Sequence, residues 1–190
     1  NEFIQHGPKK VCNSCYDCNH TLFNQIDKNY LKLSNYLNKD DFNYAEKLSS
    51  SLTKNEIINF NQDNVNVGEH CLAGTLRFYG IGDIDIKENS TKVLRKYFKS
   101  ALLVKNSFEK ILDKKKYDAV VVDHGLYIPQ GIITEVSNNK NIPTKVMWQG
   151  YKENSLLISD KITYHKSLIN ENKEDWSNYN FNNLKQNKIM

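Results

Sequence analysis

Asp123, His124 and Gly125 directly follow the apolar run Ala119–Val122, and their types suit chemistry at a ligand site. An apolar, β-branched run that ends in polar residues is typical of a parallel strand delivering side chains to the carboxyl edge of an α/β sheet, where ligands bind. His124 is a candidate catalytic base or hydrogen-bond partner of a substrate hydroxyl, and Asp123 is a candidate to orient its imidazole. Gly125 permits a tight turn and close approach of a ligand. The alternative is a loop histidine bonded to backbone, with Asp123 capping a turn.

Aromatic and polar residues after this strand and the next are expected to share the same cleft. Tyr127 and Gln130 follow His124 closely enough to lie beside it. Trp148 and Tyr151 come at the end of the next apolar run, whose carboxyl end meets the same sheet edge if the two strands are parallel. Their rings are candidates for stacking on a sugar or a base, and the alternative is a hydrophobic plug over the sheet.

Two further residues are candidate contacts to the ligand. His165 ends the triplet Thr-Tyr-His after a third apolar run and is a candidate for the same crevice, or a solvated loop histidine. Arg77 and Arg95 are the only arginines in a chain with 26 basic residues. Arg77 therefore indicates bidentate binding of a carboxylate or phosphate. The alternative is a surface ion pair with Glu69 or with an aspartate.

Three cysteines near the start of the chain have the spacing of metal ligands. Cys12, Cys15 and Cys18 repeat at intervals of Cys-x-x-Cys, which brings thiolates to one ion. A structural zinc needs a fourth ligand, and no second Cys-x-x-Cys pair follows. The alternative is a group of reduced thiols in a loop. The remaining candidate ligands are His6, His20 and Cys71.

Hydrophobic periodicity predicts helices in the first two thirds of the chain and a strand–helix–strand unit after them. The expected helices cover residues 21–38, Asp40 or Asp41 to Leu52, Gly68–Tyr79 ended by Gly80, Ser90–Lys116 capped by Asn89 or Ser90, and 129–139, with residues 59–66 as a polar connection. The expected strands are 118–123, 144–148 and 155–159.

These elements predict an α/β fold with a Rossmann-like parallel sheet, flanking helices and a helix-rich amino-terminal half. Residues 1–20 are expected to be a Cys-rich irregular segment, and residues 21–190 an α/β domain. A length of 190 residues is sufficient for a hydrophobic core without disulfides or metals.

Composition excludes some classes of function. The net charge of +4 is too small and too dispersed to indicate a nucleic-acid-binding protein. No apolar run is long enough for a transmembrane helix, and no signal-peptide pattern opens the sequence. Cysteines clustered within a few residues favour a reducing compartment, so the expected location is the cytoplasm.

The stretch His124–Gly131 (His-Gly-Leu-Tyr-Ile-Pro-Gln-Gly) belongs to a longer order of motifs. A long helix and a Gly-Glu…Arg helix precede it, and Asn-Ile-Pro, a strand with Trp148, Thr-Tyr-His and Trp176 follow. This order resembles bacterial proteins of capsule, lipopolysaccharide and other surface-polysaccharide biosynthesis, which are glycosyltransferases of the two-Rossmann-domain (GT-B) type. The similarity covers most of residues 60–176.

The resemblance implies transfer of a sugar from a nucleotide-sugar to a growing glycan. It implies that this chain is the acceptor-side domain, that the donor-binding carboxy-terminal domain is missing, and that the isolated chain is inactive. His124 would be the base, with Tyr127, Trp148 and His165 as walls of the acceptor cleft. No cofactor is expected in the chain itself apart from a possible zinc ion at the cysteines, and peripheral association with the inner membrane fits the family. The alternatives are a metal-binding interaction module built on the cysteines and a non-catalytic, glycan-binding relative.

Overall fold

The computed structural model describes residues 13–22, 25, 30–150, 152–163 and 166. The chain divides into two compact units, Asn1–Asn35 and Tyr36–Met190. In the first unit residues 13–22 are helical, so the expectation of an irregular segment over residues 1–20 is wrong for its described part. The helix expected over residues 21–38 is also wrong, because residues 30–32 are not helical and η1 (Leu33–Tyr36) is a short 3-10 helix. The division between the units falls after Asn35 rather than after residue 20.

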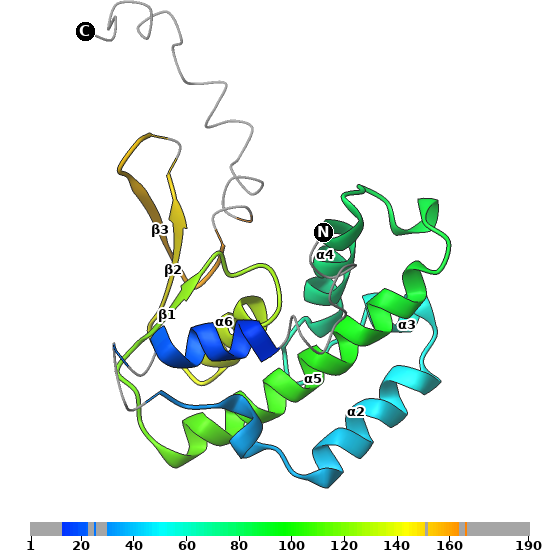
Figure 1. Cartoon of the computed structure of the whole chain (residues 1–190), viewed down its shortest axis with the longest axis horizontal. Coiled ribbons are helices and arrows are strands. Elements are labelled where there is room, and N and C mark those ends of the chain that lie inside the picture. The colour runs from blue at the N-terminus through cyan, green and yellow to red at the C-terminus, as the bar shows by residue number, and fades with distance from the viewer. Residues whose placement is uncertain (1–12, 23–24, 26–29, 151, 164–165, 167–190) are drawn as a thin grey trace, which may run out of the picture. The chain divides into compact units, whose positions relative to one another are not determined.

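Among the described residues of the second unit, helices come first and the strands follow from Val120 on, as the periodicity predicted (Figure 1). Among the described residues, none of the helices combines the length and the apolar character needed to cross a lipid bilayer. The helices after η1 are α2 (Lys39–Ser51), α3 (Lys54–Ile58), α4 (Val67–Tyr79), the 3-10 helix η2 (Ile84–Ile86), α5 (Ser90–Lys114) and α6 (Gln130–Asn139).

Side-chain caps set where the first helices begin. The amino end of α2 is capped by Asn38, whose side chain accepts from the Asp41 amide while the Asp41 carboxylate accepts from the Asn38 amide. The expected cap at Asp40 or Asp41 is therefore wrong by two or three residues, and Asp41 is the reciprocal partner. Thr53 and Glu56 form the same capping box at α3. At the other end of α4, Gly80 takes the left-handed conformation predicted for a helix stop.

The hydrophobic core lies around α5, which packs against α2, α3, α4 and α6. Its apolar stripe includes Leu94, Phe98 and Leu102, all fully buried. Phe98 meets Phe60 edge to face, with ring centroids 4.9 Å apart. Burying one such side chain contributes about 1.5–3 kcal/mol, so α5 is the element on which the other helices are assembled.

The sheet is mixed, with strand order β1-β2-β3. The first two strands, β1 (Val120–Asp123) and β2 (Thr144–Gln149), are parallel, as expected of a strand–helix–strand unit. The third, β3 (Leu156–Asp160), runs antiparallel to β2, so the prediction of an all-parallel sheet is wrong. The connection from β2 to β3 is too short for a parallel crossover, which takes a dozen residues or more. The structure is thus of α/β type, with a small sheet of mixed strand direction and flanking helices.

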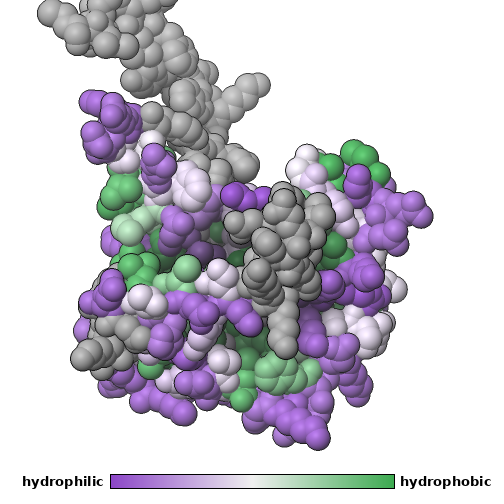
Figure 2. All heavy atoms as spheres, viewed as in Figure 1, coloured by the Kyte–Doolittle hydropathy of each residue, from purple (hydrophilic) through white to green (hydrophobic). Residues whose placement is uncertain are grey.

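One face of this sheet packs on α6 and the other carries exposed side chains. Val122 and Val146, paired in register, are buried on the α6 side. On the opposite face Val121, Leu156 and Ile158 are 56%, 65% and 62% exposed. Figure 2 shows apolar side chains on the side of the molecule where the sheet lies in Figure 1. Among the described strands, β1 is therefore an edge strand with one open face.

Candidate functional site

A cavity of about 350 Å³ lies at the carboxyl ends of β1 and β2. Two of the strand-end residues that line it are Asp123 of β1 and Trp148 of β2, and α4 and the start of α6 supply others. Six lining residues are ones that the sequence predicted for a site: Arg77, Asp123, His124, Tyr127, Gln130 and Trp148. Three were not predicted: Gly74, Tyr97 and Ile128.

His124 occupies an unusual backbone conformation directly after β1. Its amide donates to the Met147 carbonyl over 2.8 Å, and the Gly125 amide donates to the Asp123 carbonyl over 2.7 Å. The second bond closes a three-residue γ-turn around His124, whose φ is +65°. A γ-turn with positive φ is rare and strained, and such strain persists where surrounding contacts enforce it. The turn places His124 in the wall of the cavity.

Gly125 makes this turn possible. Its φ is +66°, a conformation that residues with a Cβ rarely adopt. A Cβ at Gly125 would also lie 2.8 Å from Cγ1 of Val146, too close for any real contact. The sequence predicted close approach of a ligand to Gly125. In this structure the close neighbour of Gly125 is Val146 of β2.

The His124 imidazole is packed between two aromatic side chains of the cavity. Its ring centroid lies 4.0 Å from the Trp148 ring at 85° and 4.6 Å from the Tyr127 ring. The residue is only 7% exposed. His124 therefore forms part of the cavity wall, and little of the residue is exposed. The two rings restrict its orientation and exclude water from most of its surface.

Arg77 reaches the same cavity from the last turn of α4. Its guanidinium carbon lies 4.6 Å from the centre of the Tyr127 ring, a cation–π contact of about 0.5–1 kcal/mol at an exposed site. Glu69, the ion-pair partner considered for Arg77, instead binds Lys166 with an N–O distance of 2.9 Å. The alternative of an Arg77–Glu69 surface pair is therefore wrong.

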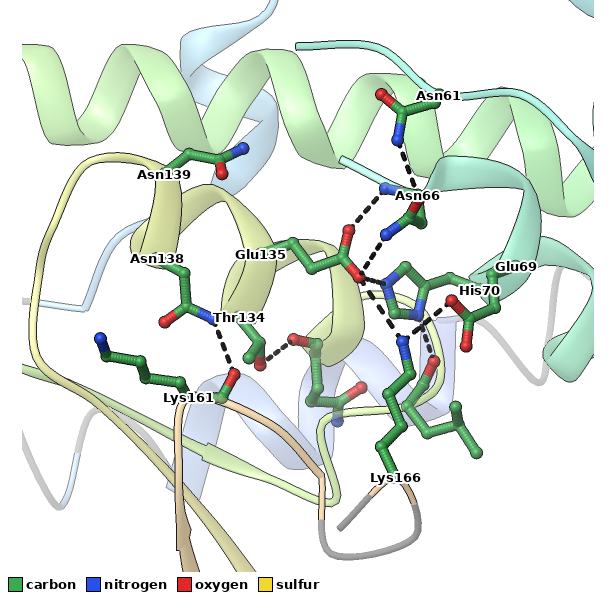
Figure 3. Close-up of polar contacts among 12 residues, drawn as sticks. Asn61, Asn66, Glu69, His70, Thr134, Glu135, Asn138, Asn139, Lys161 and Lys166 are labelled. Atoms are coloured by element: carbon green, nitrogen blue, oxygen red, sulfur yellow. Dashed lines mark hydrogen bonds and ion pairs between the residues drawn. The ribbon is translucent and has the colours of Figure 1, made fainter. Parts of the chain in front are cut away.

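His70 is a buried residue that sequence reasoning missed, and it supports the loop between His124 and α6 (Figure 3). It is 1% exposed. Its Nδ1 lies 2.6 Å from the Leu126 carbonyl oxygen, and its Nε2 lies 3.2 Å from Oε1 of Glu135 on α6. The Leu126 carbonyl and the Glu135 carboxylate are both hydrogen-bond acceptors, so the His70 ring lies between two acceptors.

Glu135 joins the His70 side chain to the segment before α4. Burial raises the pKa of the Glu135 carboxyl, but the contact with His70 and the hydrogen bonds from Asn66 outweigh burial and bring the pKa below its ordinary value. Figure 3 shows Lys166 pointing toward the carboxylates of Glu69 and Glu135, and the Glu135 contact is 3.9 Å long. The loop that carries Tyr127 is thus held by a charged network outside the cavity.

Gly131 lets His70 reach the loop. A Cβ at Gly131 would lie 2.3 Å from His70 Nδ1 and 2.7 Å from the Leu126 carbonyl oxygen. The sequence signal that could have revealed this contact is a histidine within an apolar helix, combined with a glycine in the first turn of another. Neither feature indicates the other without the fold, because the two positions are distant along the chain.

The remaining predicted residues do not join this cavity in the described part of the chain. Tyr151, His165 and Cys12 lie outside the described residues. Cys15 and Cys18 are exposed on the helix over residues 13–22. Cys71 is fully buried in the core, and burial raises the pKa of its thiol well above the ordinary value, so it is a poor metal ligand. Within the described residues, no group of three or more candidate ligands is placed to hold a metal ion.

Comparison of the chain with models of protein families, with curated proteins and with solved structures finds no match. The chemistry of the site is therefore argued from its geometry.

Proposed function

We propose that this unit binds the glycan acceptor of a glycosyltransferase that builds capsule or another surface polysaccharide. The observation that supports the proposal is one cavity combining the His124 imidazole with the Tyr127 and Trp148 rings at the carboxyl edge of two parallel strands. Aromatic rings pack on the C–H faces of sugars while polar groups take the hydroxyls. The volume of about 350 Å³ is at the small end of the range for ligand pockets, about 300–1,000 Å³, and suits one or two sugar rings.

The proposed reaction needs a base beside the acceptor hydroxyl. As that hydroxyl oxygen attacks the anomeric carbon of the donor, its proton passes to the base, and the bond from the anomeric carbon to the nucleoside diphosphate breaks. His124 is the candidate base, held by the Trp148 and Tyr127 rings. Gln130 and Asp123 offer hydrogen bonds to other hydroxyls from the cavity wall. The nucleotide-sugar donor is proposed to bind outside this cavity.

Intrinsic fluorescence tests acceptor binding directly, because Trp148 lines the cavity and the chain has only one other tryptophan, Trp176. In the Trp176→Phe protein all tryptophan emission comes from Trp148. We expect glucose, N-acetylglucosamine, glucuronate or their oligosaccharides to change this emission saturably. Uridine diphosphate should not compete, since the cavity is assigned to the acceptor.

The role of His124 is tested by His124→Asn in the Trp176→Phe protein. Asparagine tolerates positive φ better than most residues, so the γ-turn is kept while the imidazole is removed. We expect weaker sugar binding with an unchanged far-UV circular dichroism spectrum. In an assay of transfer by the intact protein, loss of a general base should lower kcat by about 10²–10⁴-fold. A Trp148 signal that responds to no sugar in this panel would contradict the proposal.

A further inference from the structure

Arg77 is the only lysine or arginine among the described residues that line the cavity. Its guanidinium lies over the Tyr127 ring, whose other neighbour is His124. This packing orients the planar guanidinium at the wall of the cavity. A side chain with long rotatable bonds is thereby partly ordered before any ligand arrives, which lowers the entropy lost on binding.

No carboxylate of the described residues neutralises Arg77. The two glutamates near α4 are engaged elsewhere, Glu69 with Lys166 and Glu135 with His70. Asp123 lines the same cavity, yet the structure has no ion pair between it and Arg77. Among its described lining residues, the cavity therefore presents a cationic group from α4 without a carboxylate paired to it.

The guanidinium has a defined preference among ligands. Its N–H groups form a fork that matches the two oxygens of a carboxylate or phosphate. A neutral sugar hydroxyl uses only one of these donors. An acidic group is therefore favoured at the α4 wall of the cavity.

Resting on the proposed function, we propose that the acceptor sugar is acidic and that Arg77 binds its carboxylate or phosphate. The acidic group points to α4, and the uncharged hydroxyls face Asp123 and His124. Arg77 is thus the residue that determines specificity for an acidic over a neutral acceptor.

Matched sugars test this assignment with the Trp148 signal in the Trp176→Phe protein. Glucose, glucuronate and glucose 6-phosphate share a ring and differ in the group at carbon 6. We expect at least one acidic sugar to bind about tenfold or more tightly than glucose, since hydrogen bonds between charged groups are about twice as strong as neutral ones. The tighter of the two acidic sugars identifies carboxylate or phosphate as the preferred group.

Arg77→Gln should remove this preference, so that the ratio of glucose affinity to acidic-sugar affinity approaches one, while Arg77→Lys, which keeps the charge and loses the fork, should retain part of it. The control is Lys92→Gln, the same change in charge at an exposed position of α5 outside the cavity. Equal binding of glucose and both acidic sugars, unaffected by Arg77→Gln, would overturn this inference and leave the proposed function standing. No response to any of the three sugars would overturn this inference, and no response to N-acetylglucosamine or to the oligosaccharides either would overturn the proposed function as well.

Discussion

His70 and Gly131 act together on the loop that carries Tyr127, although neither lines the cavity. The His70 ring contacts the Leu126 carbonyl, and Gly131 leaves the space that this contact needs. The position of Tyr127, and through its ring contact that of His124, depends on two residues with no role in the chemistry itself.

Gly131→Ala tests this dependence. The new methyl group meets both His70 and the Leu126 carbonyl, so we expect a loss of about 1–3 kcal/mol in the free energy of unfolding and weaker sugar binding at Trp148. The matched control is Gly82→Ala, because a Cβ there meets nothing within 4 Å and its φ is not positive. Urea denaturation measures both variants. Equal stability of Gly131→Ala and the wild type would show that the close approach is not needed.

Among single residues, the sequence predicted those that line the cavity better than those that hold its loop in place. Arg77, His124 and Trp148 could be predicted because each stands at or near the end of an element recognisable from its periodicity. The support by His70 could not, because its partner at Leu126 is a backbone carbonyl 56 residues away. Nothing in the identity of Leu126 encodes that contact.

Helices α4 and α6 are joined by the ion pair between His70 and Glu135. Both side chains are largely buried, so loss of one leaves the other charge without its partner. The pair lies beside the loop that leads from β1 into α6 and ties that loop to the helical half of the unit.

Acid should weaken this junction. The pKa of Glu135 is lowered in the folded protein, so its contribution to stability is fully present above its ordinary value of 4.5 and is lost as the pH falls through the lower folded value. We expect Glu135→Gln to lower the free energy of unfolding by about 1–3 kcal/mol near neutral pH and by less in acid. Urea denaturation between pH 6 and pH 2.5 measures the difference between the two proteins. A difference that stays constant with pH would show that the Glu135 charge does not stabilise the fold.

The long helices could be predicted from their apolar stripes, whereas the short helix α3 and the direction of β3 were missed. Helix α3 has five residues, too few for a periodic stripe, although its Thr53-x-x-Glu56 capping box was a usable signal. The antiparallel course of β3 follows from the short connection after β2. Strand composition alone carries no information on direction.

Two cavities of similar volume lie at opposite ends of β2, one at its carboxyl end and the other at its amino end. The second, also about 350 Å³, is formed at the amino end of β2 by residues that include Asn141, Lys145 and Lys161. It contains no aromatic side chain among its described lining residues. The aromatic cavity at the carboxyl edge is the one assigned to a glycan, and the other serves as an internal reference.

An NMR titration of the ¹⁵N-labelled chain with glucuronate and N-acetylglucosamine compares these two cavities in one experiment. The account predicts saturable shifts at the Trp148 indole N–H and at the Gly125 and Tyr127 amides, with Asn141 and Lys161 unchanged. Shifts confined to Asn141 and Lys161, or no saturable shift at Trp148, would contradict it.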